Sequence, residues 1–368
     1  MSAAPRVLVC GAVLGQPMGG VRRHNAELLP RAARLLAKAG GELCVLAGRE
    51  PIAFELPPEA RVLASDVPAG PPVARAKAEE RALARALDDA RAGGRPFDLV
   101  HTAHLPVPRK LAAPYTLTLH DLRALHLRSA PFIRRLFAGP VVGGAVRGAA
   151  RVIAVSETVR AELIERYALT AERVAVVPNG ADHLPVLPRR PGADAPLLVV
   201  GHLEPRKNAE LVLAAIATDP SLPRALFCGA AKGDAAERLD ARAAEFGVTA
   251  RVERRSDVDD AELARLYAAC AAVVLPSRLE GFCIPALEAQ RAGAPLAICD
   301  APHSALAEVA GPSAPSFAPD DAEGCARAIR AALARTTEEL GRDAARANAH
   351  PWDASAERLV ATWRAAVN

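Results

Sequence analysis

The sequence predicts an α/β protein built from two doubly wound parallel sheets. Short runs rich in Val, Leu and Ile alternate with longer stretches of Ala, Arg, Glu and Leu, which is typical of parallel strands joined by crossover helices. This pattern restarts after residues 184–196, a segment with four prolines that reads as a linker. The length of 368 residues suits two or three domains of about 100 to 200 residues each. We therefore expect domains over residues 1–186 and 187–350 and a final helix over 351–368.

The elements follow from apolar runs and their spacing. In the first half we expect strands at residues 6–10, 42–47, 99–101, 115–119, 152–155 and 174–177. The clearest helices there cover residues 20–39 and 74–92. In the second half we expect strands at residues 197–201, 225–228, 250–253, 273–275 and 295–299. After Thr337 a helical stretch is interrupted at His350-Pro351, and an amphipathic helix from Asp353 places Leu359, Trp363 and Val367 on one face.

Composition excludes several classes of protein. With 51% hydrophobic and 24% charged residues, the chain is too apolar to stay disordered and too charged for a polytopic membrane protein. The longest uncharged apolar run, 266–277, has 12 residues, whereas a spanning helix needs about 20. The apolar run near the start of the sequence is too short for the hydrophobic segment of a signal peptide. Seven scattered cysteines without a Cys-x-x-Cys pair indicate reduced thiols in a cytoplasmic protein and argue against zinc.

The net charge of +4 hides an uneven distribution. Residues 1–190 hold 27 basic and 17 acidic side chains, a balance of +10, whereas residues 191–368 hold 19 and 25, a balance of −6. The first half is therefore the candidate for meeting an anionic partner.

A glycine-rich segment follows the first expected strand and ends in Gly19-Gly20, just before a helix. Glycines at that place let backbone N–H groups approach a phosphate. The spacing is not Gly-x-Gly-x-x-Gly, and no acid follows the second strand, which disfavours a nicotinamide dinucleotide site. Contact with a phosphate or substrate and a simple flexible turn both remain open.

The strand at 115–119 ends in His120-Asp121. Ligands of open parallel sheets bind at the carboxyl ends of strands. Because neighbouring residues at a strand end point in different directions, we expect one of the two to face a ligand and the other to cap the following loop. A purely structural His120 stays open. Neither a Gly-x-Ser-x-Gly nor a His-Glu-x-x-His motif is present, so hydrolase triads and zinc proteases lack support.

In the second half, the first strand ends at Gly201 and is followed by Arg206-Lys207 before a helix. Two adjacent cations at a strand end form an anion site, in which Arg can fork onto phosphate oxygens and Lys acts as a point charge. A solvated basic pair is the alternative.

Residues 274–289 are the most informative segment. A strand leads into a polar turn with Glu280 and Gly281, then Pro285 stands where the first turn of a helix should begin, and Glu288 lies inside that helix. The N-terminus of this helix predicts a phosphate site, and the carboxylates beside it can accept hydrogen bonds from sugar hydroxyls. A sugar nucleotide, which has both phosphates and hydroxyls, would match both features. Each acid alone could be structural.

Taken together, these segments resemble the retaining glycosyltransferases of family 4, also called group 1, with the two-domain GT-B fold. The matching segments occur in the family's order: Gly19-Gly20, 152–157, 177–180, 201–208, 266–271, the Glu280-x7-Glu288 pair, 307–309 and the helix at Trp352. The resemblance covers nearly the whole chain and implies two Rossmann-like domains facing across a cleft. The N-terminal domain would bind the acceptor and the C-terminal domain the donor.

The resemblance also implies roles for individual residues. Arg206 and Lys207 would hold the donor diphosphate, Glu280 would face the transferred sugar, and Glu288 would contact the ribose. His120 would sit by the anomeric carbon and be catalytic together with Arg206, Lys207 and Glu280. Further donor contacts would come from Gly19, Gly20, Gly201, Gly281, Phe282, Cys283 and Ile284. The last helix would cross back onto the first domain.

Two positions depart from the family pattern: His202 stands where Arg is frequent, and Cys283 stands where glycine is common. The histidine at 202 suggests that Arg206, instead of residue 202, supplies the second cation for the phosphates. The cysteine at 283 adds a side chain near the phosphates. No bound metal and no cofactor are expected, because two cations and a helix end can neutralise the leaving group.

The expected activity is transfer of a hexose from a nucleotide diphosphate sugar to a hydroxyl of a glycan, glycolipid or lipid-linked acceptor, with retention. The motif forms are closest to bacterial mannosyltransferases using GDP-mannose, while UDP- and dTDP-hexoses stay open. Two other classes remain: a sugar-nucleotide epimerase, which needs no acceptor, and a non-catalytic binding subunit, which would tolerate loss of His120. Nucleic acid is not an expected partner.

Aromatic and basic residues at 131–137, within the acceptor half, suit contact with an anionic membrane surface. An ordinary amphipathic core helix is the alternative for this segment.

Overall fold

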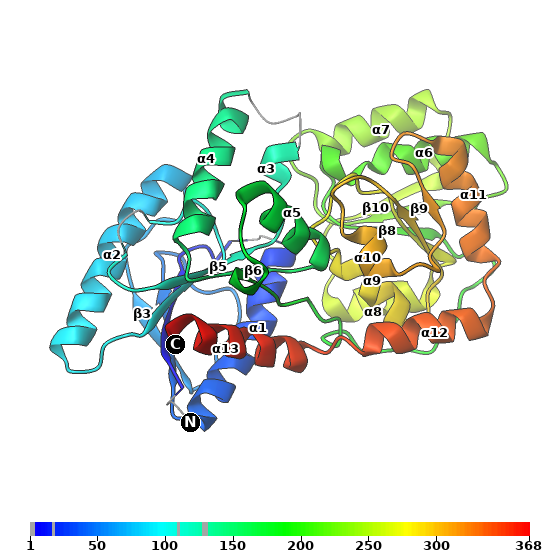
Figure 1. Ribbon diagram of the computed structural model, residues 1–368. Coiled ribbons are helices and arrows are strands. Elements are labelled where there is room, and N and C mark those ends of the chain that lie inside the picture. The colour runs from blue at the N-terminus through cyan, green and yellow to red at the C-terminus, as the bar shows by residue number, and fades with distance from the viewer. Residues whose placement is uncertain (1–3, 17–18, 109–110, 127–131) are drawn as a thin grey trace. The chain divides into compact units, whose positions relative to one another are not determined.

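A computed structural model describes residues 4–16, 19–108, 111–126 and 132–368, with the backbone alone for 132–138. Within these ranges the chain forms two compact units, one of residues 1–179 with 352–368 and the other of residues 180–351 (Figure 1). Each unit holds a parallel sheet with crossover helices. The predicted class, two Rossmann-like α/β domains, is therefore confirmed.

The first unit holds seven strands in its described part. They are β1 (Arg6–Gly11), β2 (Glu42–Ala47), β3 (Ala60–Ala64), β4 (Leu99–Thr102), β5 (Tyr115–Leu119), β6 (Arg151–Ala154) and β7 (Val174–Val176). Their order in the sheet is β3-β2-β1-β4-β5-β6-β7, all parallel. The helices are α1 (Gly20–Lys38), α2 (Pro72–Ala92), α3 (Arg123–His126), α4 (Phe132–Gly148), α5 (Glu157–Tyr167) and α13 (Trp352–Val367), with the 3-10 turn η1 (Ala171–Arg173).

The second unit has the same plan. Its strands are β8 (Leu197–Val200), β9 (Ala225–Cys228), β10 (Val252–Arg255), β11 (Ala272–Leu275), β12 (Leu296–Cys299) and β13 (Ser316–Phe317), in the parallel order β10-β9-β8-β11-β12-β13. Its helices are α6 (Ala209–Thr218), α7 (Ala235–Glu245), α8 (Asp260–Ala269), α9 (Ile284–Arg291), α10 (Leu306–Ala310), α11 (Ala322–Leu333) and α12 (Thr337–Asn348), with turns η2 (Pro205–Lys207) and η3 (Thr249–Arg251). The order reverses between β8 and β11, where sheets of this kind bind ligands.

Local sequence explains where several helices begin. Ser156 precedes α5, and its hydroxyl accepts a hydrogen bond from the amide of Val159. Thr336 and Glu339 form a reciprocal capping box at the start of α12. The central strands are buried on both faces, which is why they read in the sequence as unbroken apolar runs.

Two edge strands were not predicted. β3 has only half-buried and exposed residues, and β13 has two residues, so neither produces an apolar run. β10 starts at Val252 rather than at residue 250, because residues 249–251 form η3.

The border between the units lies between Asn179 and Gly180, earlier than the predicted border after residue 186. Residues 180–186 join the second unit because Ala181 and Leu184 are buried and because Arg291 donates hydrogen bonds to the carbonyl oxygens of both residues.

Helix α13 belongs to the first unit and packs against α1. Trp352, Leu359 and Trp363 are fully buried along it. Val367 was predicted on the same face but is 36% exposed, because it is the last residue of the helix and the buried face ends one turn earlier, at Trp363.

No helix in the described part of the chain has both the length and the apolar character that crossing a membrane requires. All seven cysteines are buried free thiols. The predicted membrane-contact segment covers residues 131–137. Pro131 lies outside the described residues, and for residues 132–137 the structure describes the backbone but not the side chains.

Candidate functional site

The site in the second unit starts at the ends of β8 and β11. These strands are neighbours, and the amide of Arg278 donates to the carbonyl of Arg206 at 2.8 Å, which joins the loops that follow them. Gly201 directly follows β8 and has a φ of +134°, and a Cβ there would lie 3.3 Å from Cε and Nζ of Lys207. A side chain at this position would therefore be strained and would displace the lysine.

Arg206 and Lys207 share a carboxylate. Nζ of Lys207 lies 2.5 Å from Oε1 of Glu280, and a guanidinium nitrogen of Arg206 lies 3.1 Å from Oε2. Arg206 also pairs with Glu204 at 2.7 Å, and Lys232 pairs with Glu204 at 3.1 Å. Three cations thus share two carboxylates, and the cluster keeps one formal positive charge. The structure brings together the three second-unit residues that were predicted to be catalytic.

Glu280 is 7% exposed. Burial alone would raise the pKa of its carboxyl group, but Lys207 and then Arg206 outweigh burial and lower this pKa to about 2. Its backbone is fixed as well, since its amide donates to the hydroxyl of Ser304 at 3.1 Å and its carbonyl accepts from Ala305 at 2.8 Å. Glu280 therefore stays ionised and holds both cations in place.

This lowered pKa makes a prediction about stability and pH. A depressed carboxyl pKa stabilises the folded state above the unfolded pKa of about 4.5, and the contribution is lost as the pH falls toward 2. We expect Glu280→Gln to lower the free energy of unfolding by about 3 kcal/mol at pH 7, and we expect this deficit to shrink steadily between about pH 5 and pH 2. Urea unfolding at a series of pH values measures it.

The matched control for this prediction is Glu338→Gln. It removes an exposed carboxylate whose partner in the described part of the chain is its helix neighbour Arg342, so the free energy of unfolding should change little. A deficit of Glu280→Gln that is the same at pH 7 and pH 3 would contradict the assigned ion pairs.

The loop from Gly281 to Cys283 leads into α9. Cys283 has φ +78° and ψ +74°, in the left-handed region, where a side chain costs about 1–2 kcal/mol. Cys283 thus holds a backbone conformation that favours glycine, the residue that is common here in the family pattern. The amides of Gly281, Phe282 and Cys283 donate to no acceptor within the described ranges, so they are available to an anion at the helix N-terminus.

The side chains around this loop are apolar and buried. Phe282, Cys283 and Ile284 are each almost fully buried, so their contribution to an anion site would come from the backbone. Burial, followed by Glu280, raises the pKa of the Cys283 thiol to about 12, which rules it out as a nucleophile near neutral pH. Pro285 is the second residue of α9 rather than the first.

Glu288 lies in the second turn of α9 and is 7% exposed. The hydroxyl of Tyr267 donates to its Oε2 at 2.7 Å, and Nε2 of His183 lies 3.0 Å from its Oε1. Burial and then Glu288 raise the pKa of Tyr267 well above its usual value, so the hydroxyl remains a donor. Sequence reasoning had assigned no role to Tyr267 or His183.

His202, the other departure from the family pattern, adds no positive charge. Burial and then Lys232 lower the pKa of its imidazole, which favours the neutral form near pH 7. Arg206 and Lys207, the two cations paired with Glu280, carry the positive charge next to this loop.

In the first unit, His120 follows β5 and packs edge-on against His24, with ring centroids 4.7 Å apart. His24 is buried and lies 2.8 Å from Oδ1 of Asn179 through its Nδ1. Burial, then His24 and His101, lower the pKa of His120 well below 6.5. Its Nε2 is buried without a hydrogen-bond partner among the residues that the structure describes. His120 therefore offers a neutral imidazole with one nitrogen unused by the protein.

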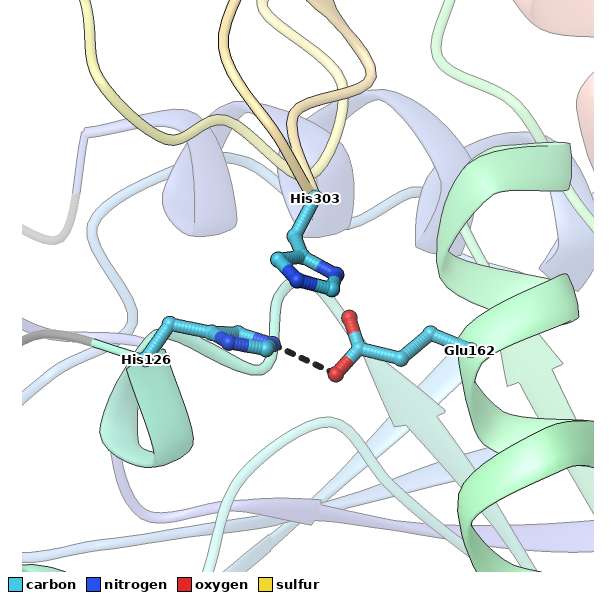
Figure 2. Close-up of side chains that lie close together, drawn as sticks. All are labelled: His126, Glu162 and His303. Atoms are coloured by element: carbon cyan, nitrogen blue, oxygen red, sulfur yellow. Dashed lines mark hydrogen bonds and ion pairs between the residues drawn. The ribbon is translucent and has the colours of Figure 1, made fainter.

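The loop after His120 is held in place by polar contacts. Oδ1 of Asp121 accepts a hydrogen bond from the amide of Arg123 at 3.1 Å, so Asp121 caps the loop as expected. Farther along, Figure 2 shows His126 of α3 and Glu162 of α5 turned toward one another, with Nε2 and Oε1 2.5 Å apart. This pair ties α3 to α5.

Gly19 and Gly20 lie at the start of α1 in the first unit. Gly19 has φ +53° and precedes the helix, a conformation that L side chains rarely adopt. A Cβ added at Gly20 would meet no atom within 4 Å. The backbone at this helix start is therefore accessible, as contact with a phosphate would require.

Comparisons with known proteins extend over both units. Residues 188–349 match the family described as glycosyl transferases group 1, and residues 18–183 match glycosyltransferase family 4. The chain is 29% identical over 291 residues to a D-inositol 3-phosphate glycosyltransferase of Segniliparus rotundus, covering 73% of this chain and 61% of that protein. It is 27% identical over 233 residues to the O-antigen chain mannosyltransferase RfbU of Salmonella typhimurium, covering 63% and 64%. The chain thus spans about three-fifths of the length of these curated relatives.

Among solved structures, the sucrose-phosphate synthase of Thermosynechococcus elongatus superposes with a TM-score of 0.78 at 22% identity, covering 98% of each chain. At this identity the likeness concerns the fold, and it agrees with the two parallel sheets described above.

Proposed function

Because the chain belongs to the group 1 and family 4 glycosyltransferases, we propose that it transfers a hexose from a nucleotide diphosphate sugar to an acceptor hydroxyl with retention. The observation that carries this proposal is the cluster in the second unit, where Arg206 and Lys207 are both bound to the buried Glu280. The available amides of the loop before α9 lie just after Glu280 in the chain.

In the proposed reaction, the bond between the sugar C1 and the diphosphate breaks, and the acceptor oxygen bonds to C1 on the same face. The acceptor proton goes to an oxygen of the departing phosphate, so no protein base is required. Arg206, Lys207 and the loop amides stabilise the charge that develops on the diphosphate. Glu280 does not serve as a nucleophile, because both of its oxygens are engaged by cations.

His120 has the properties that a neutral hydrogen-bonding group near the reacting sugar needs. Its lowered pKa keeps it uncharged, so it does not repel the positive charge that develops on the sugar ring in the transition state. The nitrogen without a partner among the described residues can bond to the sugar or to the acceptor.

The proposed reaction requires no metal ion, because the protein cations take the place that Mg²⁺ has in other nucleotide enzymes. We expect the rate of sugar transfer to be the same in excess EDTA and in millimolar Mg²⁺, measured as acceptor glycosylation at saturating donor. A rate that disappears with EDTA and returns with Mg²⁺ would refute metal independence. Conversion of the donor to another sugar nucleotide without acceptor would indicate an epimerase instead.

For the donor we propose GDP-mannose. The motif forms Leu203-Glu-Pro-Arg-Lys-Asn208 and Ser277-Arg-Leu-Glu-Gly-Phe282 support it, as does the similarity to a mannosyltransferase. The name of the Segniliparus relative specifies inositol phosphate and leaves the sugar open.

A thermal-shift panel of GDP, UDP and dTDP tests the nucleotide. A ligand present at 100 times its dissociation constant stabilises the folded state by about 2.7 kcal/mol, and we expect GDP to give the largest shift. Guanosine, which lacks the diphosphate, is the control and should give a much smaller shift. A larger shift with UDP or dTDP would overturn GDP-mannose and leave the transferase proposal standing.

For the acceptor we propose an anionic molecule bound by the first unit. The first unit, residues 1–179 with 352–368, holds 27 basic and 18 acidic side chains, a balance of +9, which favours a phosphorylated or lipid-linked acceptor. Inositol phosphate, named for the Segniliparus relative, and a lipid-linked phosphate therefore belong in the first acceptor screen, beside an uncharged sugar as control.

A further inference from the structure

The carboxylate of Glu288 is held by one hydrogen-bond donor on each of its two oxygens. Tyr267 donates to Oε2 at 2.7 Å, and His183 contacts Oε1 at 3.0 Å through Nε2, whose N–H donates. Tyr267 is 1% exposed, and the side chain of His183 is 3% exposed. Both contacts are therefore shielded from competition by water.

The two donors come from separate parts of the second unit. Tyr267 lies on α8, while His183 lies in the segment that enters this unit just after the border at residue 179. Arg291, one turn after Glu288 on α9, donates to the carbonyl oxygens of Ala181 and Leu184, on either side of His183. The imidazole is consequently fixed relative to the helix that carries Glu288.

A free glutamate side chain loses conformational entropy when it is ordered. Tyr267 and His183 order this carboxylate before any ligand binds. An ionised carboxylate can accept about four hydrogen bonds, and the two donors use one position on each oxygen. Among the residues that the structure describes, these two donors leave one position per oxygen, which matches a pair of adjacent hydroxyl groups.

We propose that His183 and Tyr267 are positioning residues that orient Glu288 toward the 2′ and 3′ hydroxyls of the donor ribose, and that they thereby select ribonucleotide over deoxyribonucleotide donors. This inference rests on the proposed function and on the role that the family resemblance implies for Glu288, contact with the ribose of the donor. The selectivity arises because a 2′-deoxy sugar would leave one oriented lone pair of a buried carboxylate without a partner.

The test compares ribonucleotides with their 2′,3′-dideoxy analogues, using GDP with dideoxy-GDP and UDP with dideoxy-UDP. Binding is measured by calorimetry for the wild type, Tyr267→Phe, His183→Leu and His183→Gln. We expect Tyr267→Phe and His183→Leu to weaken binding of the ribonucleotide by about three- to tenfold, the range of one lost hydrogen bond. Binding of the dideoxy analogue should not change. His183→Gln, which retains an N–H donor, should recover most of the loss.

Kinetics supply a second measurement on the same variants. The KM for the nucleotide sugar should rise by the same factor while kcat at saturating donor stays near the wild-type value, because the ribose is remote from the bond that breaks. Tyr167→Phe is the matched control: it removes a buried hydroxyl on α5 that has no hydrogen-bond partner among the described residues. It should leave binding and kinetics unchanged.

Equal weakening of the ribonucleotide and the dideoxy analogue would overturn the inference and show that the two residues only support the fold. A fall in kcat without a change in KM would also overturn it. Failure of the wild type to bind any nucleotide would instead refute the proposed function, and the inference with it. Unfolding midpoints close to the wild-type value for all variants establish that the comparison concerns folded protein.

Discussion

Replacing Lys207 with alanine is expected to lower turnover by about 10²- to 10³-fold, the loss that follows removal of one preorganised charge contact to a developing anion. In the proposed reaction the lysine ammonium stabilises the departing diphosphate. Glu280 binds that ammonium, and the absence of a side chain at Gly201 leaves room for it after β8. The measurement is kcat for sugar transfer at saturating donor and acceptor.

The charge-matched control is Lys38→Ala, at the exposed end of α1, which should turn over like the wild type. Since Lys207→Ala also leaves Glu280 with one partner fewer, Lys207→Met provides a check that retains most of the aliphatic stem. Both variants should be equally slow. Near-normal turnover in either variant would remove Lys207 from the chemistry and would leave the proposed leaving-group stabilisation without its main support.

Replacing Trp363 with alanine is expected to destabilise the first unit by about 3–5 kcal/mol, the usual cost of removing a large aromatic side chain from a core. The indole is fully buried and packs edge-on against His101, with ring centroids 5.2 Å apart. The helix that carries Trp363 contacts α1 and the strands β4, β5 and β6. Removal of the indole side chain therefore leaves a cavity between these elements.

Denaturant unfolding followed by circular dichroism measures this effect. Trp363→Phe should recover much of the loss, and Val367→Ala, at the exposed end of the same helix, should stay within about 0.5 kcal/mol of the wild type. If the two units unfold in separate steps, the step assigned to the first unit should move and the other should not. An unchanged unfolding curve would show that α13 does not belong to the core of the first unit.

The sequence alone predicts most of the strands, because central parallel strands are buried on both faces and appear as unbroken apolar runs. β2, β5 and β9 were predicted with the bounds that they have in the structure. β3 and β13 were missed for the opposite reason: β3 lies at an edge with exposed side chains, and β13 is too short for any pattern. Burial of individual residues at the end of α13 also depends on tertiary packing, which explains the error at Val367.

Some contacts of the site can likewise be predicted from the sequence, and others cannot. The proximity of Arg206 and Glu280 follows from adjacent strand ends, since the loops after neighbouring parallel strands meet at one edge of a sheet. The contacts of Glu288 with His183 and Tyr267 do not follow from any local pattern, because they join three separate segments of the fold. The left-handed backbone of Cys283 was likewise invisible in the sequence, where only the departure from a common glycine marked the position.

The return of α13 to the first unit has a consequence for synthesis of the protein. The second unit is one continuous segment, residues 180–351, whereas the first unit needs residues 352–368 to complete its core. Domains generally fold as units while a chain emerges from the ribosome, the N-terminal one first. Here the order of completion is reversed: the second unit has all its residues before the first does, and the first half of the chain must wait for the last helix to bury α1.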